Sequence, residues 1–431
     1  FLLLIGFQLS AQSKKWTLEE CVDYAIKNNI SIKQSELDLK TSDVEKLEAI
    51  GGFLPTLNGN ANYSINTGAS INPVTNQFQN QTFKSFSASA NSNIMLFNGL
   101  ANWKTLQRSK LNQIANTYRL DKMKDDIALS IANSYLQILF NKEQLKVQKN
   151  QNLVTKENIK RTQELIEAGS LPAGDIYELQ ATDATQEQQI ISTENALLIS
   201  KVALCQTLLL EDYATFDISD EVIDLPMSNI TNETQEAILA KAKESVKDVK
   251  IALSNVDVAK KDVAISRSSY LPTLTGFVGY NTRWSESTPF NFADQLSLFD
   301  GTAVGLQLSV PILNGFATRG RVQRAKINQE RSEFQLKQAE LDLERNVYQA
   351  YNDVINAKKS FEAAQKTLEA RKQSFNFSKE RYEVGLMNSF DFSQSTIAYE
   401  NAQSEVLRTK YDYIFRTKIL EFYFGIPLIK K

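Results

Sequence analysis

The strongest constraint on this 431-residue chain is that it carries nearly the same pattern twice. The phrase "FLPTL" at 53–57 corresponds to "YLPTL" at 270–274, and "LFNG" at 96–99 corresponds to "ILNG" at 312–315. Further along, "EAGSLPAGD" at 167–175 corresponds to "EVGLMNSFD" at 383–391, so the offset stays at 216 or 217 residues. A unit of this size is much longer than a solenoid repeat, and the duplication therefore predicts two paired halves of one domain.

Each half contains a long segment without glycine or proline, from 100 to 168 and from 321 to 384. Segments of this composition, rich in Lys, Gln, Glu, Leu and Ala, predict helices that each extend roughly 100 Å. Their apolar residues recur at seven-residue steps, which indicates coiled-coil packing. The steps are Val347, Val354, Phe361, Leu368, Phe375 and Tyr382, and in the first half Ile131, Ile138, Leu145, Asn152, Ile159 and Ile166.

Between these helical segments, each half has two runs in which apolar and uncharged polar residues alternate. They cover 56–66 and 85–97 in the first half, and 273–283 and 302–313 in the second. Such alternation is typical of the strands of a membrane β-barrel. Four strands cannot close a barrel, and lipid does not tolerate open strand edges, so we expect other copies of the chain to supply the missing strands.

The start of the chain, "FLLLIGF" followed by "QLSAQ", predicts that residues 1–11 belong to a secretory signal peptide and that the mature chain is exported. The 48 basic and 50 acidic residues give no electrostatic reason to expect binding to nucleic acid. The sequence has no histidine and no evident nucleophile–base pair, so we expect no enzyme, no cofactor and no metal site. Cys21 and Cys205 either form a disulfide or are two buried thiols.

The duplicated order of helix, strand pair, long helix, turn and returning helix resembles the TolC-type outer-membrane efflux proteins. The resemblance covers essentially the whole mature chain. Its marks are the doubled "LPTL" and "NG" phrases and "RYEVGLMNSFDFSQ" at 381–394. It implies a mainly α fold with a membrane β-barrel part, assembled as a homotrimer with a twelve-stranded barrel, a twelve-helix periplasmic tunnel and a mixed α/β belt. It also implies docking to a periplasmic adaptor protein and an inner-membrane transporter.

The sequence divides on this basis into four parts. Residues 1–11 are the signal segment, and 213–235 are a linker in the equatorial region. The first repeat, 12–212, contains strands 56–66 and 85–97, a long helix 98–168 and a returning helix 172–212. The second repeat, 236–431, contains strands 273–283 and 302–313, a long helix 316–384 and a returning helix 388–424.

Two pairs of residues are predicted to end the helices. Pro55 and Pro272 are expected at the seam where a helix stops and a barrel strand begins, because proline cannot continue a helix. Gly169 and Gly385 are expected to cap the long helices. Together with Pro172 these glycines form the tip turns, where the resemblance implies adaptor docking.

The resemblance also implies that Asp175 and Asp391 belong to acidic rings at the periplasmic aperture, and it matches Tyr382 to a latch tyrosine. The alternative for each Asp is an ordinary helix N-terminal residue that complements the helix dipole. Met387 stands where some relatives have Arg, and Gln394 stands where a second acidic residue often lies. We therefore expect closure to depend on packing of Tyr382 and Met387 rather than on an Arg-based latch.

The sequence thus predicts a passive exit duct of a tripartite efflux or type I secretion system. It would lie in the outer membrane, in contact with lipid, and extend into the periplasm. The alternative from another class is a secreted or surface coiled-coil structural protein. Oligomers that require detergent would favour the channel, and a water-soluble rod would favour the alternative.

Overall fold

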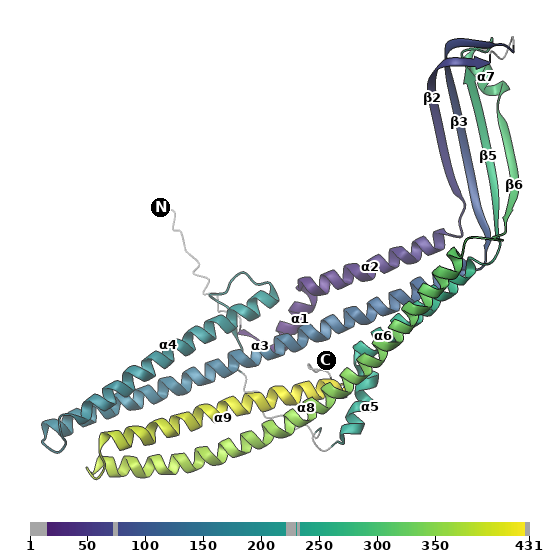
Figure 1. Ribbon diagram of the computed structural model, residues 1–431. Coiled ribbons are helices and arrows are strands. Elements are labelled where there is room, and N and C mark those ends of the chain that lie inside the picture. Colours follow the sequence, from purple (N-terminus) through teal and green to yellow (C-terminus); the bar gives the residue numbers. More distant parts are fainter. Residues whose placement is uncertain (1–14, 72–75, 221–229, 231–232, 427–431) are drawn as a thin grey trace, which may run out of the picture. The chain divides into compact units, whose positions relative to one another are not determined.

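The computed structural model of the chain describes residues 15–71, 76–220, 230 and 233–426 (Figure 1). The predicted signal segment, and much of the predicted linker, lie outside these residues. The chain forms two compact units. Among the described residues, unit 1 contains 15–36, 119–249 and 338–426, and unit 2 contains 37–118 and 250–337.

The two halves match element by element. Helices α1 (Leu18–Asn28) and α5 (Gln235–Ser245) each have 11 residues, α2 (Ile30–Gly51) and α6 (Lys247–Ser268) each have 22, and α3 (Ala101–Glu167) and α8 (Ala317–Glu383) each have 67. Strands β2 (Thr56–Ile71) and β3 (Phe78–Asn98) correspond to β5 (Thr273–Ser285) and β6 (Gly301–Ser309). The returning helices are α4 (Asp175–Leu208) and α9 (Ser389–Phe424), and α7 (Phe292–Leu298) lies between β5 and β6. The predicted duplication is confirmed.

The seven-residue steps of the long helices form the core of unit 1. Val347, Val354 and Phe361 of α8 are buried, as are Ile131 and Ile138 of α3. One cluster joins α8 to α5 and α9, and another joins α3 to α1, α4 and α9. The helices therefore pack through the stripe that the heptad pattern indicates. Among the described residues, no helix is both long enough and apolar enough to cross a membrane.

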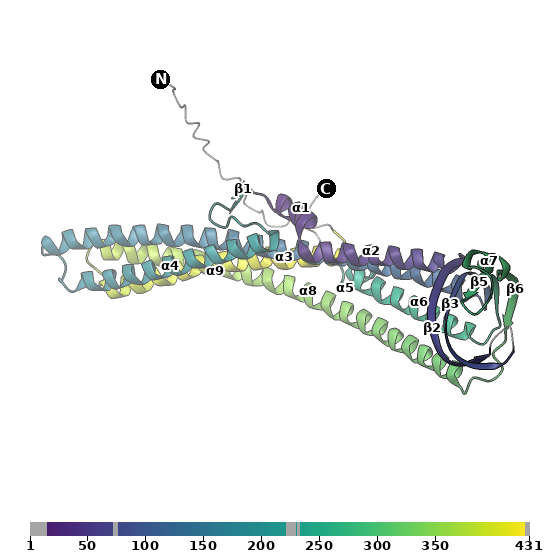
Figure 2. The ribbon, with the colours of Figure 1, turned by 90° about the horizontal axis from the view of Figure 1, so that it is seen from above.

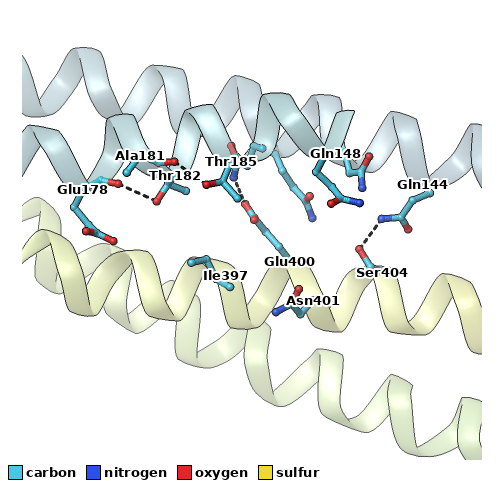
Figure 3. A pocket seen from close by; sticks show the side chains of 13 residues that line it. Gln144, Gln148, Glu178, Ala181, Thr182, Thr185, Ile397, Glu400, Asn401 and Ser404 are labelled. Carbon is cyan, nitrogen blue, oxygen red and sulfur yellow. Dashed lines mark hydrogen bonds between the residues drawn. The ribbon is translucent and has the colours of Figure 1, made fainter. Parts of the chain in front are cut away.

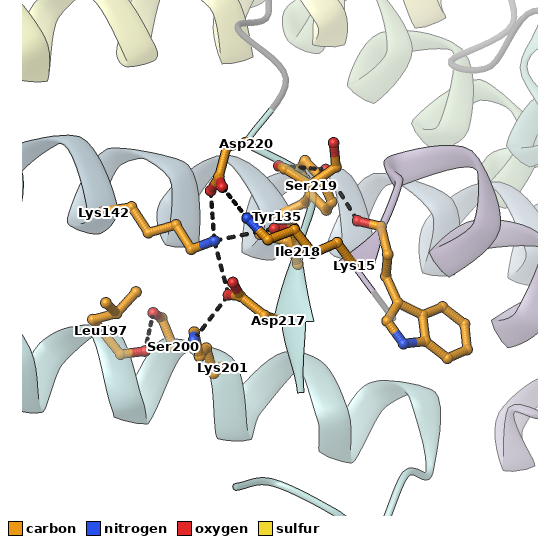
Figure 4. Close-up of polar contacts among 11 residues, drawn as sticks. Lys15, Tyr135, Lys142, Leu197, Ser200, Lys201, Asp217, Ile218, Ser219 and Asp220 are labelled. Carbon is orange, nitrogen blue, oxygen red and sulfur yellow. Dashed lines mark hydrogen bonds and ion pairs between the residues drawn. The ribbon is translucent and has the colours of Figure 1, made fainter. Parts of the chain in front are cut away.

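A short parallel pair, β1 (Lys15–Trp16) with β4 (Asp217–Ile218), is held on unit 1 by ion pairs (Figure 4). The Asp217 carboxylate forms ion pairs with Lys142 at 2.8 Å and with Lys201 at 2.9 Å. Lys142 also reaches Asp220 at 2.7 Å. Burial raises the pKa of the Asp217 carboxyl, but the two lysines outweigh burial and hold this pKa below its usual value. The network thus fastens the predicted linker to both helices of the α3–α4 hairpin.

The four long strands of unit 2 form one antiparallel sheet in the order β2-β3-β5-β6. Pro55 and Pro272 immediately precede β2 and β5, each just after a helix has ended, so both stand at the predicted seam. Hydrogen-bonded turns link α2 to this seam through Leu54 and link α6 to it through Leu271. Each half contributes one strand pair, and β3 and β5 join the two pairs along the centre of the sheet.

Several boundaries differ from the sequence prediction. Strand β6 ends at Ser309 rather than at 313, because Pro311 has no N–H group to continue the ladder. Strand β2 extends to Ile71 and strand β3 begins at Phe78. Both strands therefore include a polar stretch in which apolar and polar residues do not alternate. Helix α7 lies between the predicted strands 273–283 and 302–313, where the sequence predicts no element. The first returning helix covers Asp175–Leu208 rather than 172–212.

Cys21 and Cys205 are buried in the same core cluster as thiols rather than as a disulfide. Burial, with a smaller contribution from the charge of Asp212, raises the pKa of Cys205 to about 11. A thiol with such a pKa stays protonated and unreactive at neutral pH. The two cysteines therefore serve as small apolar core residues.

Candidate functional site

The tip of unit 1 is built by two matching helix ends. Gly169 and Gly385 have φ values of +72° and +74°. In each turn, the residue after the glycine donates its N–H to a carbonyl five residues earlier, from Ser170 to Leu165 and from Leu386 to Arg381. This is the Schellman arrangement, which needs the left-handed conformation that glycine adopts without strain. The prediction that these glycines end the long helices is confirmed.

The two candidate gate carboxylates occupy helix starts. Asp391 is exposed at the third position of α9, where its backbone N–H donates to Asn388 at 2.8 Å and its carboxylate accepts from the Asn388 amide at 3.0 Å. Asp175 is the first residue of α4 and is half-buried. Both placements have the geometry of helix N-terminal residues. Of the remaining candidates, Gln394 and Pro172 are exposed at this end of unit 1.

Tyr382 and Met387 belong to one apolar cluster between the tip helices. The Tyr382 ring stacks on Phe392 of α9 with centroids 4.6 Å apart and planes 5° from parallel. Its hydroxyl shares a hydrogen bond of 2.8 Å with Thr162 of α3, which is fully buried. Burial raises the pKa of Tyr382, the bond to Thr162 lowers it, and the charge of Asp175 adds to the increase. Tyr382 therefore joins three elements of its own chain.

The sequence reasoning missed most partners in this cluster. A second buried hydroxyl pair, Thr182 with Ser393 at 2.9 Å, joins α4 to α9. Arg161 of α3 contacts Glu383 of α8 at 2.8 Å, although both side chains are too exposed for the pair to contribute much stability. These partners lie more than 200 positions apart, and a single sequence carries no signal that pairs them.

The sheet of unit 2 has two chemically different faces. Directly opposed residues share a face, and the register places Tyr63, Phe86 and Trp284 in one row and Val278 and Val304 in another. Leu57 of β2, on this same face, is 76% exposed, and Val304 is 74% exposed. The apolar residues of all four strands therefore form a common apolar face. It is exposed at Leu57 and Val304, whereas Phe292 of α7 packs on it at Phe86 and Trp284.

The opposite face is polar and nearly uncharged. Asn58, Asn91 and Gly279 form one row, and Asn60, Ser89 and Asn281 form the next. Arg283 stands farther along this face and lies 5.6 Å from the ring of Phe299. An apolar face and a polar face on long antiparallel strands suit lipid on one side and water on the other.

Comparison with known proteins agrees with this geometry. The sequence pattern of the outer membrane efflux protein family matches residues 21–208 and 238–424, one match in each half. The outer membrane protein TolC of Escherichia coli is 22% identical over 431 residues, covering 96% of this chain and 83% of that protein. The proteases secretion protein PrtF of Dickeya chrysanthemi is 22% identical over 420 residues, covering 96% and 89%. TolC of Vibrio cholerae is 23% identical over 292 residues, covering 67% of this chain and 65% of that protein.

Solved structures share the fold. The outer membrane protein VceC of Vibrio cholerae superposes with a TM-score of 0.78 at 15% identity, covering 95% of this chain and 96% of that chain. The outer membrane channel CmeC of Campylobacter jejuni has a TM-score of 0.78 at 18% identity, with 95% and 85% covered.

The fold and its two-faced sheet define an outer-membrane channel protein. The chain belongs to the outer membrane efflux protein family. It is accordingly an efflux-type channel of the outer membrane that extends into the periplasm. The alternative of a secreted coiled-coil structural protein is not supported, and the family is one of transport ducts.

Proposed function

We propose that the chain is the passive exit duct of a tripartite efflux or type I secretion system and works as a homotrimer. One observation carries this proposal, namely an antiparallel sheet with a largely apolar face and two open edges. Strands β2 and β6 each pair with only one neighbour within the described residues. Because an open edge is not stable in lipid, the edges of β2 and β6 from successive copies would pair and close a twelve-stranded barrel.

The helices of unit 2 support the same cyclic assembly. Helix α2 exposes Leu37 and Val44, seven residues apart, and α8 exposes Ile327 and Phe334 with the same spacing. Figure 2 shows α2 and α8 on opposite sides of α6. Residues 317–337 carry six basic and two acidic side chains, whereas 37–51 carry two basic and four acidic. Apolar stripes flanked by opposite charges fit a coiled-coil seam between α2 of one copy and α8 of the next.

Mass measurement in detergent tests the assembly. The expected particle contains three chains, and a stable monomer that remains in membranes would contradict the proposal. Leu37→Glu in α2 should weaken the trimer, because it places a charge in the apolar seam. Ile50→Glu is the matched control, because it places the same charge at an exposed position about 120° or more around the helix from Leu37 and Val44.

At the tip, we propose that Asp175 and Asp391 from the assembled copies surround the periplasmic aperture, with Gln394 nearby and with Tyr382 and Met387 as the packing that holds it closed. The tip turns at Gly169, Pro172 and Gly385 would dock the periplasmic adaptor, which connects the duct to an inner-membrane transporter. A ring of carboxylates attracts cations and repels anions.

Single-channel conductance in planar bilayers tests the aperture. Asp391→Asn should lower the preference for cations and weaken block by multivalent cations, and Asp175→Asn should add to both effects. The matched control is Asp257→Asn, whose carboxylate pairs with Lys260 on α6 in unit 2. If selectivity, block and conductance all remain as in the parent protein, both Asp residues act only as helix-start residues.

A further inference from the structure

A polar cavity of about 480 Å³ lies between α3, α4 and α9 in unit 1 (Figure 3). Five glutamine residues line it, together with Glu178 of α4 and Glu400 of α9, and neither Lys nor Arg is among the lining residues described. The volume is that of a site for a small organic molecule. Neither the gate nor the barrel proposed above uses this cavity.

Oxygen atoms without donors are the first sign that the cavity accepts a ligand. Gln148 is 7% exposed, and its buried Oε1 accepts no hydrogen bond from the residues that the structure describes. The buried Oε1 of Gln144 likewise has no partner among them, because the amide of this residue donates instead to Ser404 at 2.7 Å. Buried acceptors without donors are rare and costly, so these oxygens indicate a ligand that carries N–H or O–H groups.

The charge of the groups that line the cavity indicates which class of ligand it binds. The Glu400 carboxylate accepts one hydrogen bond, from Gln186 at 2.7 Å, and no cationic side chain lines its cavity in the described part of the chain. Burial raises the pKa of Glu400 to about 6, against the smaller effect of Gln186. At neutral pH the carboxylate is therefore ionised in a partly desolvated place, and a cation would relieve the cost of this burial.

The cavity suits an organic cation rather than a metal ion. No group of three or more His, Cys, Asp or Glu side chains in the described residues could hold a metal. An ammonium group carries three donors and one positive charge, which match a carboxylate and two amide oxygens.

Glu178 supplies a second carboxylate away from Glu400. It precedes Gln186 by eight residues on α4, roughly 12 Å along the helix. Ala181 and Ile397 line the cavity as apolar residues, and Figure 3 shows Ile397 between the two carboxylates.

We propose that this cavity binds a small aliphatic diamine in its doubly protonated form. One ammonium group donates to Glu400 and to the amide oxygens of Gln144 and Gln148. The other lies at Glu178, and the methylene chain passes Ala181 and Ile397. The diamine is complementary to the lining residues: its two ammonium groups match the two carboxylates, and its methylene chain matches the apolar residues between them.

Isothermal titration calorimetry of the full chain in detergent with 1,6-diaminohexane at neutral pH tests this site. Saturable binding is expected, with clearly weaker binding of 1-aminohexane and none of the neutral 1,6-hexanediol. Glu400→Gln should weaken binding about tenfold or more, as expected for the loss of a charge-assisted hydrogen bond. Glu362→Gln, an exposed carboxylate on α8 outside the cavity, should leave binding unchanged.

Gln148→Leu gives a second arm that does not alter charge. It removes an oxygen that has no partner in the described protein, so the fold should remain intact by circular dichroism while diamine affinity falls. The proposal is overturned if the parent protein gives no binding, if the diol binds as tightly as the diamine, or if Glu400→Gln and Gln148→Leu both bind like the parent. All readouts are binding, so the result is independent of channel conductance.

Discussion

At the scale of single residues, the buried hydroxyl pair of Tyr382 and Thr162 helps to hold the tip together. Tyr382→Phe removes the partner of Thr162, which has no exposed surface. We expect a loss of about 1–2 kcal/mol in stability, because a buried hydroxyl is left without its partner. Thermal denaturation followed by circular dichroism measures it. The double variant Tyr382→Phe with Thr162→Val should recover part of the loss, and an additive loss instead would show that the pair is not coupled.

The glycine at the second tip turn gives a backbone prediction. Gly385→Ala places a side chain at a φ of +74°, with open space around it, so its cost comes from backbone strain alone. The expected loss is about 1–2 kcal/mol. Gly174→Ala is the matched control at the same tip, because Gly174 has a φ of −71° and equally open surroundings. Equal midpoints for the two variants would contradict this account.

The raised pKa of Glu400 predicts that the free energy of unfolding depends on pH. Its pKa in the folded protein is raised from 4.5 to about 6, and Glu178 is the one other titratable group among the described residues that line the cavity. Below pH 4.5 the carboxyl is protonated in both folded and unfolded chains, whereas above pH 6 the folded state is penalised by about 2 kcal/mol.

Glu400→Gln should therefore raise the unfolding midpoint at neutral pH and leave it nearly unchanged in acid. This effect on stability is opposite in sign to the effect expected on diamine binding, so the two measurements are separable. A variant that melts like the parent at both pH values would show that the carboxylate is not penalised by burial.

At the scale of elements, the heptad stripe predicts where helix packing is concentrated. Phe361 of α8 is 7% exposed and stacks on Tyr413 of α9 with centroids 6.4 Å apart. Phe361→Ala should cost roughly 3–5 kcal/mol, because it leaves a cavity in this packing. Phe377 lies on the same helix but is 65% exposed within the chain, so Phe377→Ala should cost the chain less. Thermal unfolding followed by the helical circular dichroism signal should show a larger drop in midpoint for Phe361→Ala than for Phe377→Ala.

The ion network of β1 and β4 gives a second element-scale prediction. Asp217→Asn leaves Lys142 and Lys201 without their shared carboxylate, and we expect a loss of about 1–3 kcal/mol. Because the pKa of Asp217 is lowered in the folded protein, its contribution is present at neutral pH and is lost as pH falls through that lowered pKa. Parent and variant should therefore converge in stability in strong acid, which denaturation at several pH values would detect.

Elements that depend on local signals could be predicted from the sequence, and elements that depend on distant pairing could not. Gly169 and Gly385 end their helices through their own backbone conformation, and Pro55 acts in the same local way. The extension of β2 to Ile71 depends instead on pairing with Phe78 across a polar stretch. The bond between Thr162 and Tyr382 and the diamine cavity join residues from different helices, which no periodicity within one helix reveals.

At the scale of the whole molecule, the unequal strand pairs have a consequence for what the cell displays outside. Strand β2 has 16 residues, about 53 Å when extended, whereas β6 has 9, about 30 Å. A bilayer is crossed by roughly 9–11 tilted strand residues, so the β2–β3 pair is longer than the membrane needs and β6 only just meets that need. In the proposed trimer, long β2–β3 hairpins and short β5–β6 hairpins would alternate around the barrel, so that three hairpins project above the rim of the pore. An antibody or a bacteriophage would contact these three β2–β3 hairpins before it could reach the opening between them.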